Sequence, residues 1–171
     1  MRTFVLYSRK GVTVPWHGKA IDAGRMDVVS DCARAALLLS REVRKDARFY
    51  ACLNGPPEPP KCVEVNGEEW VPIDAEGMDN LLKKKLRFAA RISFQELLKG
   101  LKGDFYIVDE RGEEMEIESK NPIFIIGDHI GLPKSDEKFI KRFNAKKISL
   151  GKKRYFAKDV ITVLNYTCDR S

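Results

Sequence analysis

The stretch NPIFIIGDHIGL, residues 121–132, decides the fold class. Pro122 precedes the apolar run IFII, and Gly127 ends that run. A short, continuous run of β-branched and aromatic residues is typical of a strand that is buried on both faces, as in a parallel sheet. We therefore predict a buried strand over residues 123–126.

The loop GDHIG, residues 127–131, follows this predicted strand. Gly127 and Gly131 bracket the loop, and glycine lets the main chain come close to a neighbouring group. Ligands of open α/β sheets bind beyond the carboxyl ends of the strands, so this loop is a candidate ligand-binding edge. From the local pattern alone, a tight turn with incidental polar residues explains the loop equally well.

The composition is that of an ordinary globular protein. The chain has 171 residues, of which 43% are hydrophobic and 33% charged, and this predicts a single domain. No apolar run is long enough to span a membrane, and the first residues, MRTFVLYS, lack the apolar core of a signal peptide, so we expect a cytoplasmic protein. Four cysteines without CxxC spacing and only two histidines argue against a metal site. The net charge of +6 permits a polyanionic partner without requiring one.

Segments with strand and helix patterns alternate along the chain. Strands are expected at residues 2–7, 48–53, 105–108 and 147–150, with a hairpin formed by 61–65 and 69–73 around Asn66-Gly67. Helices are expected at residues 24–43, 79–87, 94–101, 133–143 and 156–169, with Ser93 and Ser135 as N-caps. This alternation predicts an α/β fold with a mostly parallel sheet. Loops at strand carboxyl ends would then be 108–112, 127–132 and 150–155.

Basic residues form two groups. Arginines at positions 25, 34, 41 and 44 lie on or beside the first predicted helix, and the planar arginine side chain matches phosphate geometry. A solvated polar face, paired with nearby acidic residues, explains these arginines slightly better on composition alone. The second group, within residues 83–91, strengthens the option of a polyanionic partner.

Several stretches resemble one known family. They are AGRMDVV (residues 23–29), LSREVRKDARFY (39–50), NPIFIIGDHIGL (121–132), and KKISLG with YFAKDVITVLNY (within 146–166). The chain is similar, from Met1 almost to Ser171, to the archaeal tRNA pseudouridine-54 N1-methyltransferases of the SPOUT superfamily. The resemblance implies a single SPOUT-type α/β domain over residues 1–171, with a mostly parallel sheet flanked by helices. It also implies a deep C-terminal trefoil knot, over roughly residues 103–171, and a homodimer.

The resemblance further implies S-adenosyl-L-methionine as cofactor, held by the loops of the knot. The matching cofactor-binding residues are Val108, Gly127, Asp128, Gly131, Ile148, Ser149, Leu150, Gly151, Tyr155 and Val160. The residue types are consistent with such a site, because glycines let a ligand approach the main chain and apolar side chains suit an adenine ring.

The implied reaction is N1-methylation of pseudouridine at position 54 of tRNA. N1 is a poor nucleophile while it is protonated, so the enzyme must position this nitrogen and favour loss of its proton. Asp27 is the candidate to hydrogen-bond the base or accept that proton, and Arg25 to stabilise charge on the base or bind phosphate. An alternative that we weigh equally is that the two side chains only pair with each other and stabilise the shape of the loop.

The RNA backbone is expected to contact Arg34, Arg44, Lys84 and Arg91. Two other functions stay open at this point. One is a non-catalytic SPOUT-like module for RNA binding or assembly, and the other is a methyltransferase for a different RNA nucleotide.

Overall fold

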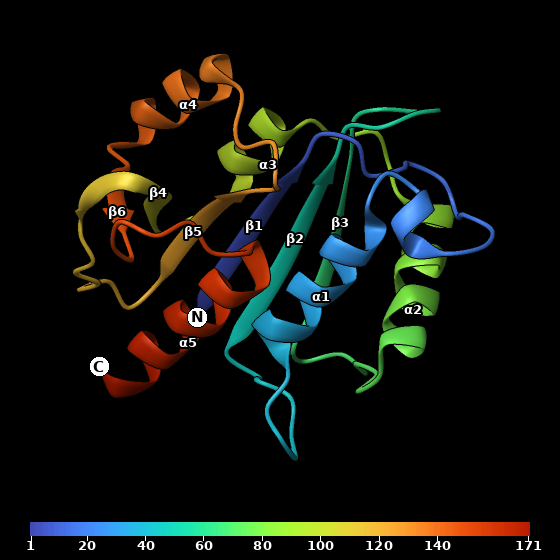
Figure 1. Ribbon diagram of the computed structural model, residues 1–171, viewed down its shortest axis with the longest axis horizontal. Helices are drawn as coiled ribbons and strands as arrows, with labels where there is room; N and C mark the ends of the chain where they lie inside the picture. The colour runs from blue at the N-terminus through green and yellow to red at the C-terminus, as the bar shows by residue number, and fades with distance from the viewer.

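A six-stranded sheet, in the order β3-β2-β1-β5-β4-β6, runs through the computed structural model of residues 1–171 (Figure 1). The strands are β1 (Arg2–Ser8), β2 (Ala47–Leu53), β3 (Lys61–Asn66), β4 (Asp104–Glu114), β5 (Pro122–Gly127) and β6 (Lys146–Ser149). All neighbouring strands pair in parallel except β2 and β3, which are antiparallel. The predicted α/β class with a mostly parallel sheet is therefore confirmed.

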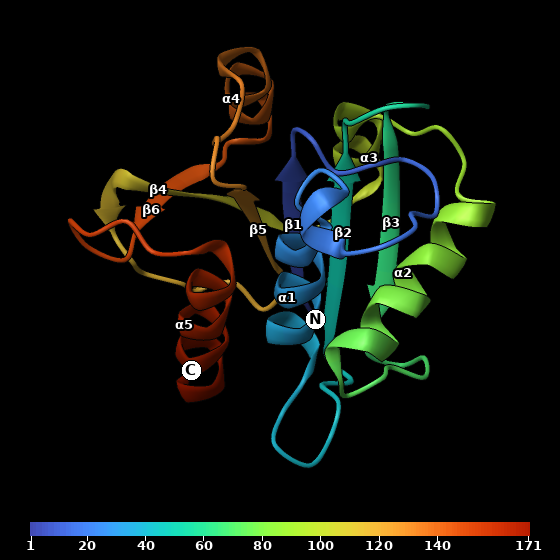
Figure 2. The ribbon, with the colours of Figure 1, turned by 45° about the vertical axis from the view of Figure 1, so that its right-hand side comes forward.

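Helices cover both faces of the sheet (Figure 2). They are α1 (Met26–Leu37), α2 (Ala75–Phe88), α3 (Phe94–Gly100), α4 (Lys134–Ile140) and α5 (Ala157–Arg170), with short 3-10 helices at Ala20–Asp22 and Lys141–Phe143. One apolar cluster joins the sheet to α1, α2 and α5, and a second joins its other face to α3 and α4. None of these helices combines the length with the apolar composition that a membrane-spanning helix requires.

The predicted buried strand is an interior strand of this sheet. β5 pairs with β1 on one side and with β4 on the other, and each residue of its IFII run is at most 4% exposed. Along β1, Phe4 and Leu6 pack into the first apolar cluster, whereas Val5 and Tyr7 pack into the second. Both faces of the central strands are therefore covered, which explains why their sequences are continuously apolar.

The hairpin predicted around Asn66-Gly67 is wrong. β3 instead pairs with β2 across the proline-rich loop, and residues 69–73 form no strand. The Asn66 side chain accepts a hydrogen bond from the Glu68 amide, forming a turn that leads toward α2. A Cβ at Gly67 would lie 1.7 Å from the Arg44 carbonyl oxygen, so close approach to another loop explains this glycine.

The helices differ from prediction in α1, α2 and α4, and α2 begins at Ala75 instead of at residue 79. α1 ends at Leu37, well before residue 43, because the following segment turns back and forms a bridge between Leu38 and Val43. Ser135 is not an N-cap, since α4 begins at Lys134 without a side-chain cap. The prediction for Ser93 is confirmed: its hydroxyl accepts a hydrogen bond from the Glu96 amide, 3.1 Å away.

A polar network fastens α5 to the rest of the fold. Asn165, only 3% exposed, donates hydrogen bonds to two carbonyl groups in the last turn of α1, and its side-chain oxygen accepts one from Arg2. Asp169 accepts two hydrogen bonds from Arg44 and one from Arg2, each 2.8 Å long. The Arg44 hydrogen bonds hold the pKa of the Asp169 carboxyl below its ordinary value. The C-terminal helix is thus anchored to the first strand and to the first helix.

Replacing Asn165 tests this anchor. Asn165→Leu should lower the free energy of unfolding by about 1–3 kcal/mol, because buried carbonyl groups and Arg2 lose their partner. Urea denaturation followed by circular dichroism measures the change. Thr162→Ala, at an exposed position of the same helix, serves as control and should stay within about 0.5 kcal/mol of the wild type. Equal stability of the two variants would show that the network does not hold α5.

Candidate active site

A cavity of 880 Å³ opens at the carboxyl ends of β4, β5 and β6. Its walls come from the start of α1, the bulged part of β4, the segment after β5, and the segment that connects β6 to α5. The volume is within the range of small-molecule sites. The cavity therefore lies where the glycine-bracketed loop predicted a ligand-binding edge.

The first wall is a bulge in β4. Val108 and Glu113 both pair with Ile148 of β6, so residues 109–112 form a bulge, and residues 109–111 of this bulge border the cavity. This agrees with the loop predicted over 108–112. A Cβ at Gly112 would lie 2.5 Å from the carbonyl carbon of Ile148, so only glycine lets the two segments pass this closely.

The second wall is the loop after β5, which is held by its own polar groups. The carboxylate of Asp128 accepts hydrogen bonds from the amides of Arg9 and Ile130, both 2.9 Å long. Arg9 also donates from Nε to the Gly131 carbonyl, 2.9 Å away. A Cβ at Gly127 would lie 2.9 Å from the Gly131 Cα. The loop is therefore preformed, and Asp128 organises it through main-chain amides.

The third wall follows β6. Ser149 is buried. Its hydroxyl donates a hydrogen bond to the Glu110 carbonyl and accepts one from the Gly151 amide, so it stabilises this wall from behind. Gly151 has a φ of 124° with open space around its Cα, a conformation that favours glycine. Ile148 and Ser149 do not line the cavity. The other predicted cofactor-binding residues do line it: Val108, Gly127, Asp128, Gly131, Leu150, Gly151, Tyr155 and Val160.

Arg25 and Asp27 lie at the start of α1 and also line the cavity. Arg25 donates from Nε and Nη2 to the two carboxylate oxygens of Asp27, at 2.9 and 3.0 Å, and its Nη1 has no partner within the chain. These hydrogen bonds lower the pKa of Asp27, which makes its carboxylate a weak base. The pairing that the sequence analysis left open is therefore present, and it leaves the Nη1 group of Arg25 free.

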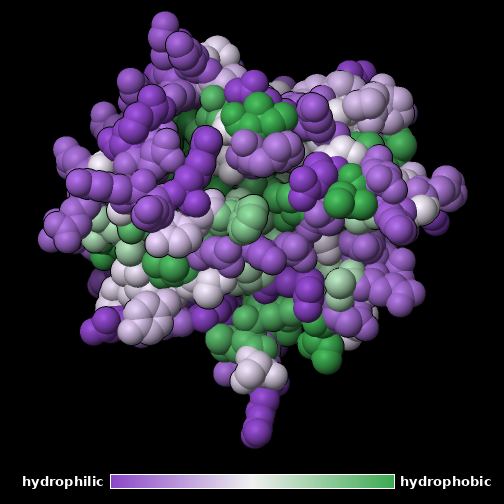
Figure 3. Space-filling view, viewed as in Figure 1, coloured by the Kyte–Doolittle hydropathy of each residue, from purple (hydrophilic) through white to green (hydrophobic).

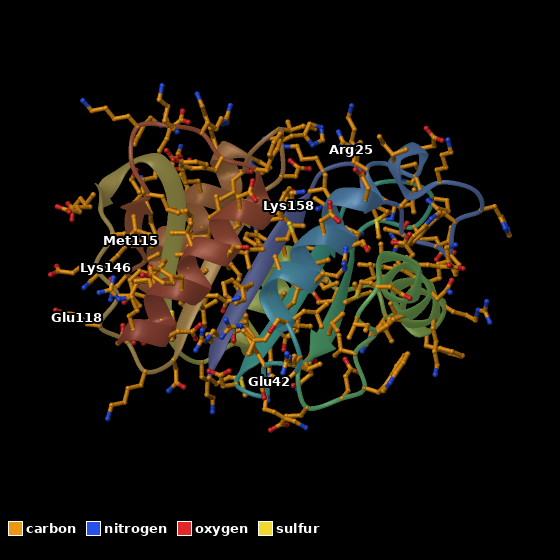
Figure 4. All side chains as sticks on the ribbon, turned by 60° about the horizontal axis from the view of Figure 1, so that its bottom comes forward. Arg25, Glu42, Met115, Glu118, Lys146 and Lys158 are labelled. Carbon is orange, nitrogen blue, oxygen red and sulfur yellow. The ribbon has the colours of Figure 1, made fainter.

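The backbone at Arg25 is held in a left-handed conformation, with a φ of 63°. Such a conformation costs a non-glycine residue on the order of 1 kcal/mol and is concentrated at functional sites. The preceding Gly24 is also left-handed, and a Cβ there would lie 1.7 Å from the Lys10 carbonyl oxygen. Figure 4 shows Arg25 and Lys158, from α1 and α5 respectively, on the same side of the molecule.

The electrostatics of the cavity are set by paired carboxylates, which outnumber the cations along its lining. Asp109 is one of them, and hydrogen bonds from Arg111 lower its pKa to about 2. Asp31 is another, with Lys158 at 3.9 Å. Such a lining suits a small ligand that carries positive charge.

The residues predicted to contact RNA do not line this cavity. Arg44 donates to both carboxylate oxygens of Asp169 and its side chain is only 10% exposed, so its guanidinium is engaged within the chain. Arg34 lies 4.0 Å from Asp31 on α1. Lys84 and Arg91 are exposed on and beyond α2, which lies across the molecule from α5 (Figure 1).

Sequence reasoning missed many of the lining residues, and two charged groups among them show why. Asp109 and Arg111 were expected only as part of a charged loop, because a bulge next to the cavity has no signature of its own. Lys153 and Arg154 had a signal, since the basic stretch KKRYF follows the last strand, but it was not assigned to the site.

Comparison with known proteins gives consistent matches. A family model described as "Putative SAM-dependent RNA methyltransferase" matches residues 1–171. The chain is 31% identical to the tRNA (pseudouridine(54)-N(1))-methyltransferase of Methanocella arvoryzae, over 99% of this chain and 100% of the relative. The protein of the same name from Methanocaldococcus jannaschii is 30% identical, over 99% and 97%. Archaeoglobus fulgidus Nep1 bound to S-adenosylhomocysteine is similar in fold, with a TM-score of 0.71 at 16% identity, covering 98% and 97% of the two chains.

Gly127 provides a test of the preformed loop. Gly127→Ala should lower the free energy of unfolding by about 1–3 kcal/mol, because the new methyl group meets the Gly131 main chain and not open space. Thermal and urea denaturation measure it. In Gly100→Ala the added methyl group meets nothing within 4 Å, so this control should be neutral or slightly stabilising. If the Gly127 variant were as stable as the control, the loop would be able to shift and accommodate the methyl group at little cost, and it would not be rigidly preformed.

Proposed function

The chain belongs to the family of SAM-dependent RNA methyltransferases whose model spans it, and we propose that it methylates N1 of pseudouridine at position 54 of tRNA. The observation that carries this proposal is the cavity at the strand carboxyl ends, lined by the residues that the resemblance assigned to the cofactor. Relatives that carry this activity in their names match the chain over nearly its full length.

The cavity suits S-adenosyl-L-methionine in its volume and in the charge of its lining. The molecule carries positive charges on its sulfur and amino group, and carboxylates such as Asp109 and Asp31 line the cavity. Apolar side chains from three walls, Val108, Leu150 and Val160, offer a surface for the adenine ring. Of the eight lining residues of the predicted set, we assign all but Tyr155 to cofactor binding, with Ile148 and Ser149 as support behind them.

S-adenosyl-L-methionine supplies a methyl group that is electrophilic because it is bonded to a positively charged sulfur. The chain's own task is to hold pseudouridine N1 in line and to favour loss of its proton. The N1 proton leaves to solvent water, and the resulting negative charge is shared by N1 and the carbonyl oxygens of the ring. Arg25 can donate from its free Nη1 to one of these oxygens, while Asp27 holds the guanidinium in place. We propose Arg25 as the catalytic residue and Asp27 as the residue that positions it.

We extend the proposal to the finer architecture. A single SPOUT-type domain over residues 1–171 would carry a C-terminal trefoil knot over roughly 103–171, as the resemblance to the family implies. A homodimer is supported by apolar residues on α5, where Val163 and Tyr166 are 38% and 61% exposed. With tRNA as substrate, we place the activity in the cytoplasm.

Methyl transfer from labelled S-adenosyl-L-methionine to tRNA transcripts tests the function. Two transcripts are compared, identical except for uridine or pseudouridine at position 54. Label should enter only the pseudouridine transcript. Label in both would indicate another nucleotide, and label in neither, with normal cofactor binding, would indicate a non-catalytic RNA-binding module.

A variant at Asp27 tests whether this residue positions Arg25 without contributing to cofactor binding. Asp27→Asn should lower kcat on the order of 10- to 100-fold, because Arg25 loses its ionic partner, and should leave the affinity for S-adenosyl-L-methionine within about twofold. Because the Asp27 pKa is lowered, the carboxylate is ionised well below neutral pH, so the shape of the pH-rate profile near neutrality should not change. Asp22→Asn, at an exposed position without a side-chain partner, is the control. Loss of a titration step near pH 7 would instead identify Asp27 as the base.

A further inference from the structure

Acidic and basic side chains occupy different parts of the cavity. Carboxylates prevail in the lining, whereas cations gather at its opening, on the segment GKKRYF between β6 and α5, which we name the mouth loop (residues 151–156). All six of its residues are exposed. The segment projects from the molecule at the left of Figure 2, and hydrophilic side chains cover the upper left of Figure 3, over β4, β6 and α4.

The cations of the mouth loop are not used within the chain. Lys152 and Lys153 form no ion pair or hydrogen bond. Arg154 has Glu110 at 3.7 Å, but the two side chains are 73% and 42% exposed, and a pair of this kind contributes little. The mouth loop therefore presents positive charge that is available to a partner.

The basic group on and near α2 is more strongly engaged. Lys85 donates to both carboxylate oxygens of Glu69, at 2.8 and 2.9 Å, and Lys83 lies over the Trp16 ring, 4.9 Å from its centre. Only Lys84 and Arg87 of this helix are free of such partners. Charge near the cavity is thus better placed than charge on α2 to hold a polyanion against the site.

The mouth loop also contains an aromatic side chain at the cavity. Tyr155 lines the cavity and is 53% exposed, directly after three consecutive cations. Cations beside an exposed aromatic ring are the combination that binds single-stranded nucleic acid, since the cations attract phosphates and the ring stacks on a base. A base that leaves its own stack to enter a cavity needs such a replacement contact.

We propose that the mouth loop is the RNA-contacting element of this site. Lys152 and Lys153 bind the phosphates that flank the target nucleotide, and Tyr155 stacks on the unpaired base as it enters the cavity. The inference rests on the proposed function in taking RNA as the partner. The proposal places the RNA contacts on the β6–α5 connection in place of Lys84 and Arg91. It also assigns Tyr155 to RNA binding in place of cofactor binding.

Two double variants with the same change of charge test the phosphate contacts. Lys152→Gln with Lys153→Gln should weaken tRNA binding on the order of tenfold. The slope of the logarithm of the affinity against the logarithm of the salt concentration should fall by the amount expected for about two lost phosphate contacts. Lys84→Gln with Arg87→Gln should change the affinity less than about threefold. Filter binding at several salt concentrations measures both, and calorimetry with S-adenosyl-L-methionine checks that the cavity is intact. The reverse order of effects would overturn the inference.

Tyr155 is tested by a pair of substitutions. Tyr155→Ala should lower kcat/KM for tRNA about 10- to 100-fold through lost stacking, whereas Tyr155→Phe keeps the ring and should stay within about threefold. Weaker binding of S-adenosyl-L-methionine by Tyr155→Ala, with unchanged tRNA binding, would return Tyr155 to the cofactor.

The two proposals fail separately. Mouth-loop variants that bind tRNA as the wild type does, while the wild type methylates pseudouridine-54, would overturn only the loop assignment. A wild-type protein that binds tRNA through the loop and methylates no transcript would support the loop and overturn only the function.

Discussion

The fold depends on β5 being hydrogen-bonded between β1 and β4. β1 comes from a distant part of the chain, whereas β4 directly precedes β5, and pairing all three in parallel aligns their carboxyl ends. Both faces of β5 are covered, so its residues must be apolar throughout, while polar groups and glycines are left to the loop that follows. The loops after β4, β5 and β6 consequently meet at one edge of the sheet and enclose the cavity.

Close main-chain contacts then define the walls of the site. Gly112 passes across β6, Gly127 touches Gly131, and Gly24 lies against the Lys10 carbonyl. At each of these places a side chain would force two segments apart. The cavity is therefore shaped by the backbone, and the few side chains that remain, above all Arg25, supply the polar chemistry.

The sequence predicted those features that depend on local pattern. The buried strand follows from IFII, the Ser93 cap from its position before an apolar run, and the ligand edge from two glycines after a strand. The hairpin at Asn66-Gly67 was wrong because a local turn signal does not say which strands pair. The role of Arg44 was out of reach, since its partner Asp169 is 125 residues away. Resemblance to a family supplied the cofactor, which no spacing in the chain reveals.

α5 serves two parts of the molecule at once. Its first turn lines the cavity through Val160, and its last turns are fastened to β1 and α1 through Asn165 and Asp169. Binding in the cavity and global unfolding are therefore linked equilibria. A ligand present at about one hundred times its dissociation constant adds about 2.7 kcal/mol to the stability of a fold that binds it only when native. The melting temperature of this protein would thus report how much of the site is filled.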